Sequence, residues 1–448
     1  METKQKKTKN GQQEFFPGVS KIKYEGSNSK NLLSFKHYNP KERILGKTMK
    51  DWLRFSVCYW HTFRGTGADP FGVGTIKRSW DDGTQSLENA LRRVRAAFEF
   101  MSKLGVEYYT FHDRDVSPEG PTIEETEKNL DVVSDLLLEM QNKYGIKLLW
   151  GTANLFTNPI YMNGAMTNPD VHVFAHAAAQ VIKALEITHK LGGGNFVFWG
   201  GREGYHSVLN TDVRKELDHM AHFLKMARNY KNKLNSDIQL LIEPKPREPT
   251  KHQYDYDAGT VIGFLKTYGL DKDFKLNIEP NHTTLAGHDF EHDILIASKY
   301  GMLGSIDSNT GDPLLGWDTD QFPSDVKKTT LTMKYVIEMG GLSPGGLNFD
   351  AKLRRESTDL EDMFIAHIGA MDCFARGLRN AARIIEDKVL DGMVADRYSS
   401  FKSESLGQKV EEGKATLEEL AKYAKANGKP KLISGKQEKY EMIFNQYV

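Results

Sequence analysis

The chain has 448 residues, of which 39% are hydrophobic and 27% charged, and its 60 Lys and Arg balance 60 Asp and Glu to a formal net charge of +0. This balance gives no support to a nucleic-acid partner, because proteins that bind nucleic acid normally carry a basic excess. Cys58 and Cys373 are the only cysteines, too few for a disulfide framework or a Cys-type zinc site, so we expect a reducing, cytoplasmic setting.

Residues 1–52 are expected to form an irregular lead segment. The N-terminus is basic and polar and lacks the apolar core of a signal peptide. No run anywhere in the sequence approaches the ~18 apolar residues of a membrane span, so we expect no membrane partner. A few aromatic residues are placed to pin the segment onto a folded body: Phe15, Phe16, Tyr24, Phe35 and Tyr38.

From Phe55 the sequence alternates between short apolar runs and longer segments with helical periodicity. In the first helix, Leu87, Ala90, Leu91, Val94, Phe98 and Met101 recur at helical spacing, and Gly105 lies just past its end. The predicted strands are 55–60, 106–115, 146–156, 195–201, 238–244, 274–280, 302–308 and 345–351. The helices that follow them are predicted at about 87–104, 122–145, 171–193, 211–234, 257–269, 290–301, 323–340 and 360–387.

Eight alternating strand–helix units predict an α/β fold with a parallel sheet, closed as a (β/α)8 TIM barrel over residues 53–387. The competing architecture is a doubly wound open sheet. That fold more often shows a G-x-G-x-x-G phosphate-binding loop after its first strand, and the sequence has none opening a helix. Thr358 and Glu361 are predicted to form a capping box at the last helix of the barrel.

Residues 388–448 differ in composition and are predicted to form a C-terminal helical arm. Thr416 and Glu419 have the spacing of a capping box, but the following helix has only a narrow apolar stripe. A segment with such small apolar faces cannot form a core of its own. It therefore lies on the barrel or, as we favour, on another subunit.

Acidic residues end four consecutive predicted strands in the second half of the chain. These are Glu243, Glu279, Asp307 and Asp350, with His282, Asp318 and Asp320 close by in sequence. Two like charges at ~4 Å repel by on the order of 4 kcal/mol at a moderate effective dielectric, so such a cluster needs cations. Oxygen ligands favour hard ions, Mg²⁺, Mn²⁺ or Co²⁺, over Zn²⁺. Singly, each residue has an ordinary interpretation as a helix cap, loop histidine or solvated turn; together they predict a site for two divalent metal ions.

The first half of the chain supplies different chemistry. His112 and Asp115 are three apart, which lets the carboxylate hold one imidazole nitrogen for proton transfer, unless the two form a purely structural pair. Three aromatic residues fall at strand ends: Trp60, Phe156 and Trp199. They suit the walls of a sugar site, or they simply fill the end of the barrel by packing against one another. Lys245, two residues beyond Glu243, is either a donor to an oxygen that gains negative charge or a plain ion-pair partner.

Longer motifs resemble the xylose isomerases, specifically the class II subgroup with a long N-terminal segment. They are "FHDRD", "WGGREGY", "LIEPKPREPTKHQYD", "NIEPNHTTLAGHDFEH", "GMLGSIDSNTGDPLLGWDTDQFP", "GGLNFDAKLRRESTD" and a final "SGKQE", in that order. The resemblance covers about residue 35 to the C-terminus. It implies a (β/α)8 barrel whose C-terminal arm embraces a neighbouring subunit, usually in a homotetramer. It also implies interconversion of D-xylose and D-xylulose, and more weakly of D-glucose and D-fructose.

The resemblance also implies roles for individual residues. Glu243, Glu279, Asp307 and Asp350 would hold the first metal ion, and Glu279, His282, Asp318 and Asp320 the second. His112 would assist ring opening with Asp115 orienting it, and Lys245 would contact the substrate oxygen at C1. Trp60, Phe156 and Trp199 would line the sugar channel, and Phe71 would enter the site of a neighbouring subunit. After ring opening, a metal-assisted hydride shift would run from C2 to C1.

Three other functions remain open on the sequence. One is another metal-dependent ketol isomerase, acting on rhamnose or a related sugar. A second is a metal-dependent phosphodiesterase of endonuclease type, which would want a basic face and more histidine ligands. A third is a non-catalytic sugar sensor, which would have no use for a ring-opening histidine.

Overall fold

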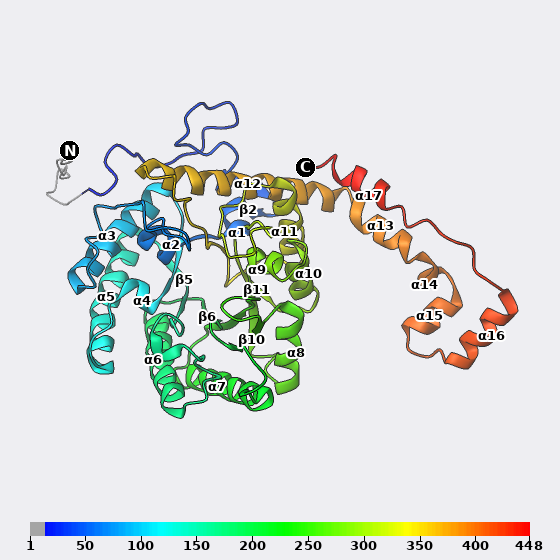
Figure 1. The fold of residues 1–448 in the computed structure, drawn as a ribbon. Helices are drawn as coiled ribbons and strands as arrows, with labels where there is room; N and C mark the ends of the chain where they lie inside the picture. Colours follow the sequence, from blue (N-terminus) through cyan, green and yellow to red (C-terminus); the bar gives the residue numbers. More distant parts are fainter. Residues whose placement is uncertain (1–13) are drawn as a thin grey trace.

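The computed structural model describes residues 14–448, and its centre is a closed parallel barrel (Figure 1). Its eight strands follow one another around the barrel in chain order, and the pairing of β12 with β3 closes it. The prediction of a (β/α)8 barrel is therefore confirmed. The strands are β3 (Phe55–Cys58), β4 (Tyr108–His112), β5 (Lys147–Thr152), β6 (Asn195–Trp199), β8 (Gln239–Glu243), β10 (Phe274–Ile278), β11 (Leu303–Asp307) and β12 (Leu347–Phe349).

Long helices surround the barrel, and several begin and end at residues that suit those positions. Ser86 accepts a hydrogen bond from Asn89 N–H at the start of α3, and Gly105 ends that helix with φ 87°. The surrounding helices are α3 (Leu87–Leu104), α5 (Ile123–Tyr144), α6 (Val171–Lys190), α7 (Val213–Lys233), α8 (Ala258–Tyr268), α10 (His292–Lys299), α11 (Val326–Glu338) and α12 (Leu360–Glu386).

Short elements occupy the strand ends and loops. They are β1 (Arg43–Ile44), β2 (Lys47–Thr48), α1 (Met49–Leu53), α2 (Tyr59–Arg64), α4 (Asp113–Val116), the 3-10 turn Pro159–Tyr161, β7 (Gly204–Tyr205), β9 (His252–Gln253) and α9 (Pro280–Leu285). Some sequence expectations were wrong in detail. Three predicted strands are too long, because residues 59–60, 113–115 and 280 belong to α2, α4 and α9. The capping box of α12 is formed by Asp359 and Asp362 and not by Thr358 and Glu361.

The lead segment is anchored to the barrel over its described part. Phe16 is fully buried against Trp80 and Phe364, with ring centroids at 5.1 and 5.5 Å. The carboxylate of Asp372 on α12 accepts three successive backbone N–H groups, from residues 36–38, at 2.7–2.8 Å. Of the aromatic residues expected to pin this segment, only Tyr24 is exposed.

The C-terminal helices leave the barrel as an arm (Figure 1). They are α13 (Val389–Arg397), α14 (Ser399–Ser403), α15 (Ser405–Glu411), α16 (Leu417–Asn427) and α17 (Gln437–Phe444), and α13–α16 bury none of their residues. The predicted capping box of Thr416 and Glu419 is present. The chain end returns to α12, where Tyr447 Oη donates to Asp387 Oδ2 at 2.8 Å. None of the helices in residues 14–448 has both the length and the apolar character needed to span a bilayer.

Candidate active site and metal centre

Carboxylates from four neighbouring strands meet at one mouth of the barrel. Glu243 and Asp307 are the last residues of β8 and β11, while Glu279 and Asp350 directly follow β10 and β12. One ligand atom of each lies within 4.8 Å of those of the others, and all four side chains are buried. The carboxyl ends of the strands in a parallel barrel share one face, which is why residues so far apart in sequence converge. These are the four residues that the family resemblance assigns to the first metal ion.

A second group shares Glu279 with the first. Ligand atoms of Glu279, Asp318 and Asp320 lie within 4.8 Å of one another, as do those of Glu243, Glu279 and His282. His282 Nε2 lies 3.1 Å from both Glu279 Oε2 and Asp318 Oδ2. Glu279 is common to all of these groups, which is the position that a bridging ligand needs.

The loop that carries Asp318 and Asp320 is not a regular extended segment. Asp320 has φ 42°, in the left-handed region that non-glycine residues seldom adopt, at a cost of roughly 1–3 kcal/mol. Backbone hydrogen bonds hold it there. Lys352 N–H donates to Asp320 O at 2.8 Å, and Thr310 and Gln321 pair on either side of the loop. With this backbone conformation the carboxylate of Asp320 lies in the cluster, within 4.8 Å of ligand atoms of Glu279 and Asp318.

Electrostatics favours a cation at this site. Burial, followed by repulsion from Asp307 and Asp350, raises the pKa of Glu243 well above its ordinary value, and burial also raises the pKa of Asp307 to about 7. Burial, followed by repulsion from Asp318, also raises the pKa of Glu279 well above its ordinary value. The amide of Asn277 donates to Glu243 Oε2 and Asp307 Oδ2 at 2.8 and 2.7 Å, but amides carry no compensating charge. The donor set, carboxylate oxygens with an imidazole, fits hard divalent ions.

Two basic residues in the cluster were missed by the sequence analysis. His61 Nε2 lies 3.1 Å from Asp320 Oδ2 and 3.2 Å from Asp350 Oδ1. Burial alone would lower the pKa of His61, but these two carboxylates raise it to about 9. Lys352 Nζ lies 3.0 Å from Asp320 Oδ2. Lys352 follows Asp350 by two residues, as Lys245 follows Glu243, and that repeated spacing was the signal available in the sequence.

Lys245 lies beside the second group. Its Nζ donates to Asp318 Oδ2 at 2.6 Å and to Glu248 Oε2 at 2.9 Å, and the side chain is almost fully buried. The pKa of Lys245 is raised because the charges of Asp318 and Glu248 outweigh burial, so the side chain is a cation. Lys245 in turn holds the pKa of Asp318 well below its ordinary value, despite burial.

His112 and Asp115 form the contact that their spacing predicts. His112 Nδ1 lies 2.7 Å from Asp115 Oδ2, and both side chains are nearly buried at the junction of β4 and α4. This contact leaves His112 Nε2 available to the cavity. The ring of Trp60 packs edge-on against His112 with centroids at 4.5 Å.

One cavity of about 200 Å³ is lined both by the carboxylate cluster and by His112 with its aromatic neighbours. Its size suits a small polar molecule better than a drug-sized ligand. Phe156 and Trp199 meet at one wall with centroids 4.4 Å apart, and Trp60 Nε1 donates to Asp350 Oδ1 at 2.9 Å. Of the predicted site residues, the lining includes Trp60, His112, Phe156, Trp199, Glu243, Glu279, His282, Asp318, Asp320 and Asp350.

Four predicted site residues are absent from the cavity lining. Asp115, Lys245 and Asp307 each lie beside a residue that lines it, whereas Phe71 stands apart. It lies in the loop between α2 and α3, and 83% of its surface is exposed. It is not among the residues that line the cavity.

Comparisons with known proteins agree with this geometry. The chain is 59% identical to the xylose isomerase of Arabidopsis thaliana over 97% of its length and 91% of the relative's, and 54% identical to that of Thermoanaerobacter pseudethanolicus over 97% and 99%. A family model described as the XylA2 C-terminal domain matches residues 394–448. A solved Rhodospirillum rubrum protein described as a candidate xylose isomerase shares the fold, with a TM-score of 0.51 at 12% identity over 72% of this chain and 98% of that one. The chain belongs to the xylose isomerase family.

Proposed function

We propose that the protein interconverts D-xylose and D-xylulose, and more weakly D-glucose and D-fructose, with two divalent metal ions. One observation carries the proposal: a buried carboxylate cluster and an Asp-oriented histidine face the same small aromatic-walled cavity. The relatives named xylose isomerase, at 53–59% identity, support it from the sequence side.

The residues that would hold the metal ions follow from the two groups. Glu243, Glu279, Asp307 and Asp350 would hold the first ion, and Glu279, His282, Asp318 and Asp320 the second. Bound Mg²⁺, Mn²⁺ or Co²⁺ would supply Lewis-acid polarisation of the sugar oxygens.

The chain's own side chains would perform the remaining tasks. Asp115 fixes Nδ1 of His112, so that Nε2 can move a proton to or from the ring oxygen as the sugar opens. The aromatic walls exclude water and cover the C–H faces of the sugar. The buried Lys245 cation would stabilise negative charge on the oxygen at C1.

The carbon-bound hydrogen would pass from C2 to C1 as a hydride. Every carboxylate that lines the cavity belongs to one of the two metal groups. These carboxylates are Glu243, Glu279, Asp318, Asp320 and Asp350. None is left over to remove a proton from carbon, which a route through an enediol would require.

Assembly and location complete the proposal. The exposed Phe71 and the arm of residues 388–448 would both contact neighbouring subunits of a homotetramer, with Phe71 entering a neighbour's site. In this scheme residues 1–52 form the lead segment and 53–387 the catalytic barrel. Cys58 and Cys373 are buried and unpaired, which suits a reducing, cytoplasmic compartment.

The test is an assay of metal-depleted protein. We expect no turnover until Mg²⁺, Mn²⁺ or Co²⁺ is restored, and then conversion of xylose faster than glucose, with rhamnose as the control sugar. A preference for rhamnose would point to the other ketol isomerase, and failure to isomerise any sugar with any of the three metals would contradict the proposal.

A further inference from the structure

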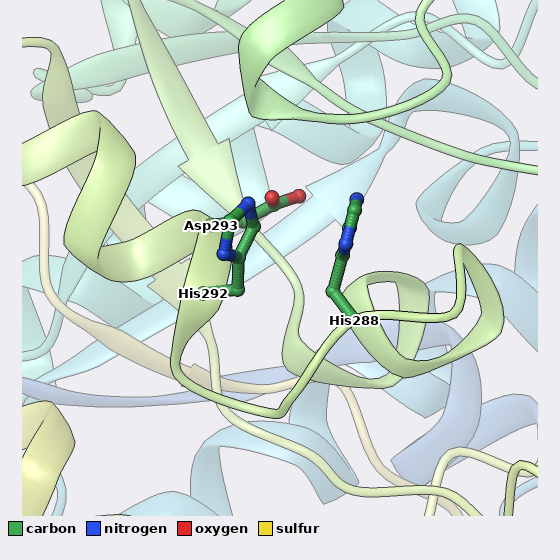
Figure 2. Close-up of side chains that lie close together, drawn as sticks. All are labelled: His288, His292 and Asp293. Carbon is green, nitrogen blue, oxygen red and sulfur yellow. The ribbon is translucent and has the colours of Figure 1, made fainter.

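A second cluster of metal-ligating side chains lies outside the sugar cavity. His288, His292 and Asp293 gather where α9 gives way to α10, and Figure 2 shows their polar ends directed toward a common space. One ligand atom from each lies within 4.8 Å of the others. None of the three lines the cavity that holds the carboxylate cluster.

The buried carboxylate of Asp293 is the feature that indicates a ligand. It is only 3% exposed, and its Oδ2 accepts the backbone N–H of Ala258, the first residue of α8, at 3.2 Å. Its Oδ1 is buried and accepts no hydrogen bond from any residue within 14–448. A buried carboxylate oxygen without a partner is unfavourable, and burial raises the pKa of Asp293 accordingly. A cation bound at Oδ1 would remove that penalty.

The two histidines present the matching donors. Their rings stack with centroids 4.3 Å apart and planes at 26°, and both are partly exposed, so an ion can reach them. Two imidazolium rings this close would repel each other, whereas neutral rings are the form that binds metals. Among the hydrogen bonds of the described chain, none involves a ring nitrogen of His292. Histidine on a metal commonly has its other nitrogen held by a carboxylate, and His288 Nε2 lies 3.1 Å from Asp257 Oδ2.

We propose that His288, His292 and Asp293, supported by Asp257, bind a divalent transition-metal ion of the zinc type. Two imidazoles and a carboxylate suit Zn²⁺ better than Mg²⁺, in contrast to the oxygen-rich catalytic cluster. The ion would fasten the start of α10 to Asp257, the N-cap of α8, and His288 N–H also donates to Thr283 O in α9 at 3.2 Å. The site would thus hold in place the helix that carries His282.

The experiment compares zinc binding by two double variants of the full-length protein. H288N/H292N removes both imidazoles of the cluster, and H219N/H222N removes two exposed histidines of α7 as the matched control. Each protein is stripped of metal, equilibrated with excess Mg²⁺ and increasing Zn²⁺, and its bound zinc is measured by mass spectrometry. Zinc also competes for the carboxylate cluster, so the difference between proteins is the readout. We expect H288N/H292N to bind one zinc ion fewer per chain than wild type, and the control to match wild type.

X-ray absorption at the zinc edge adds a second readout. Because His61 and His282 also lie at the barrel mouth, the spectra of the variants are compared, and imidazole scattering that is lost in H288N/H292N but kept in H219N/H222N identifies the new site. Circular dichroism checks that each variant is folded. If H288N/H292N does not fold, D293N replaces it and should weaken zinc binding at this site by at least about 10–100-fold, the loss that follows when only a carboxylate supporting a ligand is removed. Equal zinc content and affinity in wild type and the cluster variants would overturn the proposal.

Discussion

Oδ2 of Asp115 bonds His112 twice, accepting from the backbone N–H at 2.9 Å and lying 2.7 Å from the ring Nδ1. The double contact fixes both the position of the ring and its tautomer, with the proton on Nδ1 and the lone pair of Nε2 toward the cavity. Burial by itself would lower the pKa of His112, but the charge and hydrogen bond of Asp115 raise it overall. A histidine tuned in this way suits proton transfer to a sugar ring.

Replacing Asp115 with Asn should therefore damage catalysis without unfolding the barrel. Asn keeps the shape but lacks the charge, so the pKa of His112 should fall and the preferred tautomer should be lost. We expect kcat to drop by up to about 10²–10⁴-fold, the range that general acid–base catalysis supplies, and the acidic limb of the kcat/KM profile to move to lower pH. Glu119→Gln, on the exposed loop after α4, is the control. An unchanged pH profile in D115N would argue for a purely structural pair.

Measuring metal affinity and kcat together distinguishes the two possible roles of Lys245, as an ion-pair partner of the carboxylates or as a donor to the substrate. Lys245→Met removes a buried cation 2.6 Å from Asp318, so the carboxylate cluster becomes more negative and should bind Mg²⁺ more tightly. If Lys245 also stabilises charge on the substrate, kcat should fall by about 10²–10³-fold even at saturating metal. Tighter metal binding with kcat retained would leave Lys245 as an ion-pair partner only. Lys352→Met, which removes the cation beside Asp320, is the matched control for the electrostatic effect.

Much of the fold and of the site could be predicted because both follow from short-range patterns. The alternation of apolar runs with helical segments is local, and in a parallel barrel it dictates that strand-end carboxylates share one face. Glu243, Glu279, Asp307 and Asp350 therefore converge as expected. Pro280 disfavours a helical backbone at Glu279, whose φ of −105° and ψ of 112° are extended.

The features that escaped prediction depend on contacts distant in sequence. His61 joins the carboxylate cluster only because barrel closure brings β3 beside β12, where it meets Asp320 and Asp350. Asp320 reaches the cluster through a left-handed backbone that no spacing rule predicts. No sequence pattern singles out Asp293, whose Oδ1 is buried without a hydrogen bond within residues 14–448 where α8 packs against α10.

The metal-free protein should lose stability as the pH rises toward neutrality. Asp307 has a folded pKa of about 7, and that of Glu243 is also raised, both through burial first. A raised pKa means that the folded state holds protons that the unfolded state releases. This contribution is fully present below the unfolded value near 4 and is lost as the pH passes through about 7, which amounts to on the order of a few kcal/mol. Thermal melts of metal-free protein from pH 5 to 8 should show Tm falling, and added Mg²⁺ should raise Tm most at the high end. A Tm of the metal-free protein that does not depend on pH would contradict this.

The arm should stabilise assembly and not the barrel. Helices α13–α16 bury none of their residues within the chain, and Leu417, Leu432 and Ile433 are almost fully exposed. Deleting residues 388–448 should therefore dissociate the proposed tetramer in light scattering while the circular dichroism of the remaining helices persists. Leu432→Ser/Ile433→Ser tests the same surface without truncation. If the truncated protein keeps the same number of subunits in light scattering, the arm contributes nothing to assembly.

Isotope transfer should distinguish a hydride shift from proton transfer to a base. All five carboxylates lining the cavity belong to the metal groups, so no carboxylate is free to take a proton from carbon, and the proposal assigns His112 to ring opening. Xylose deuterated at C2, converted in ordinary water, should keep its deuterium at C1 of xylulose, and unlabelled xylose converted in tritiated water should gain almost none there. Asp350→Asn should slow both the reaction and the transfer equally, because it weakens metal binding without opening a route to solvent. Extensive loss of deuterium to water would instead require a base at C2 and would overturn the hydride shift, while leaving the proposed isomerase activity intact.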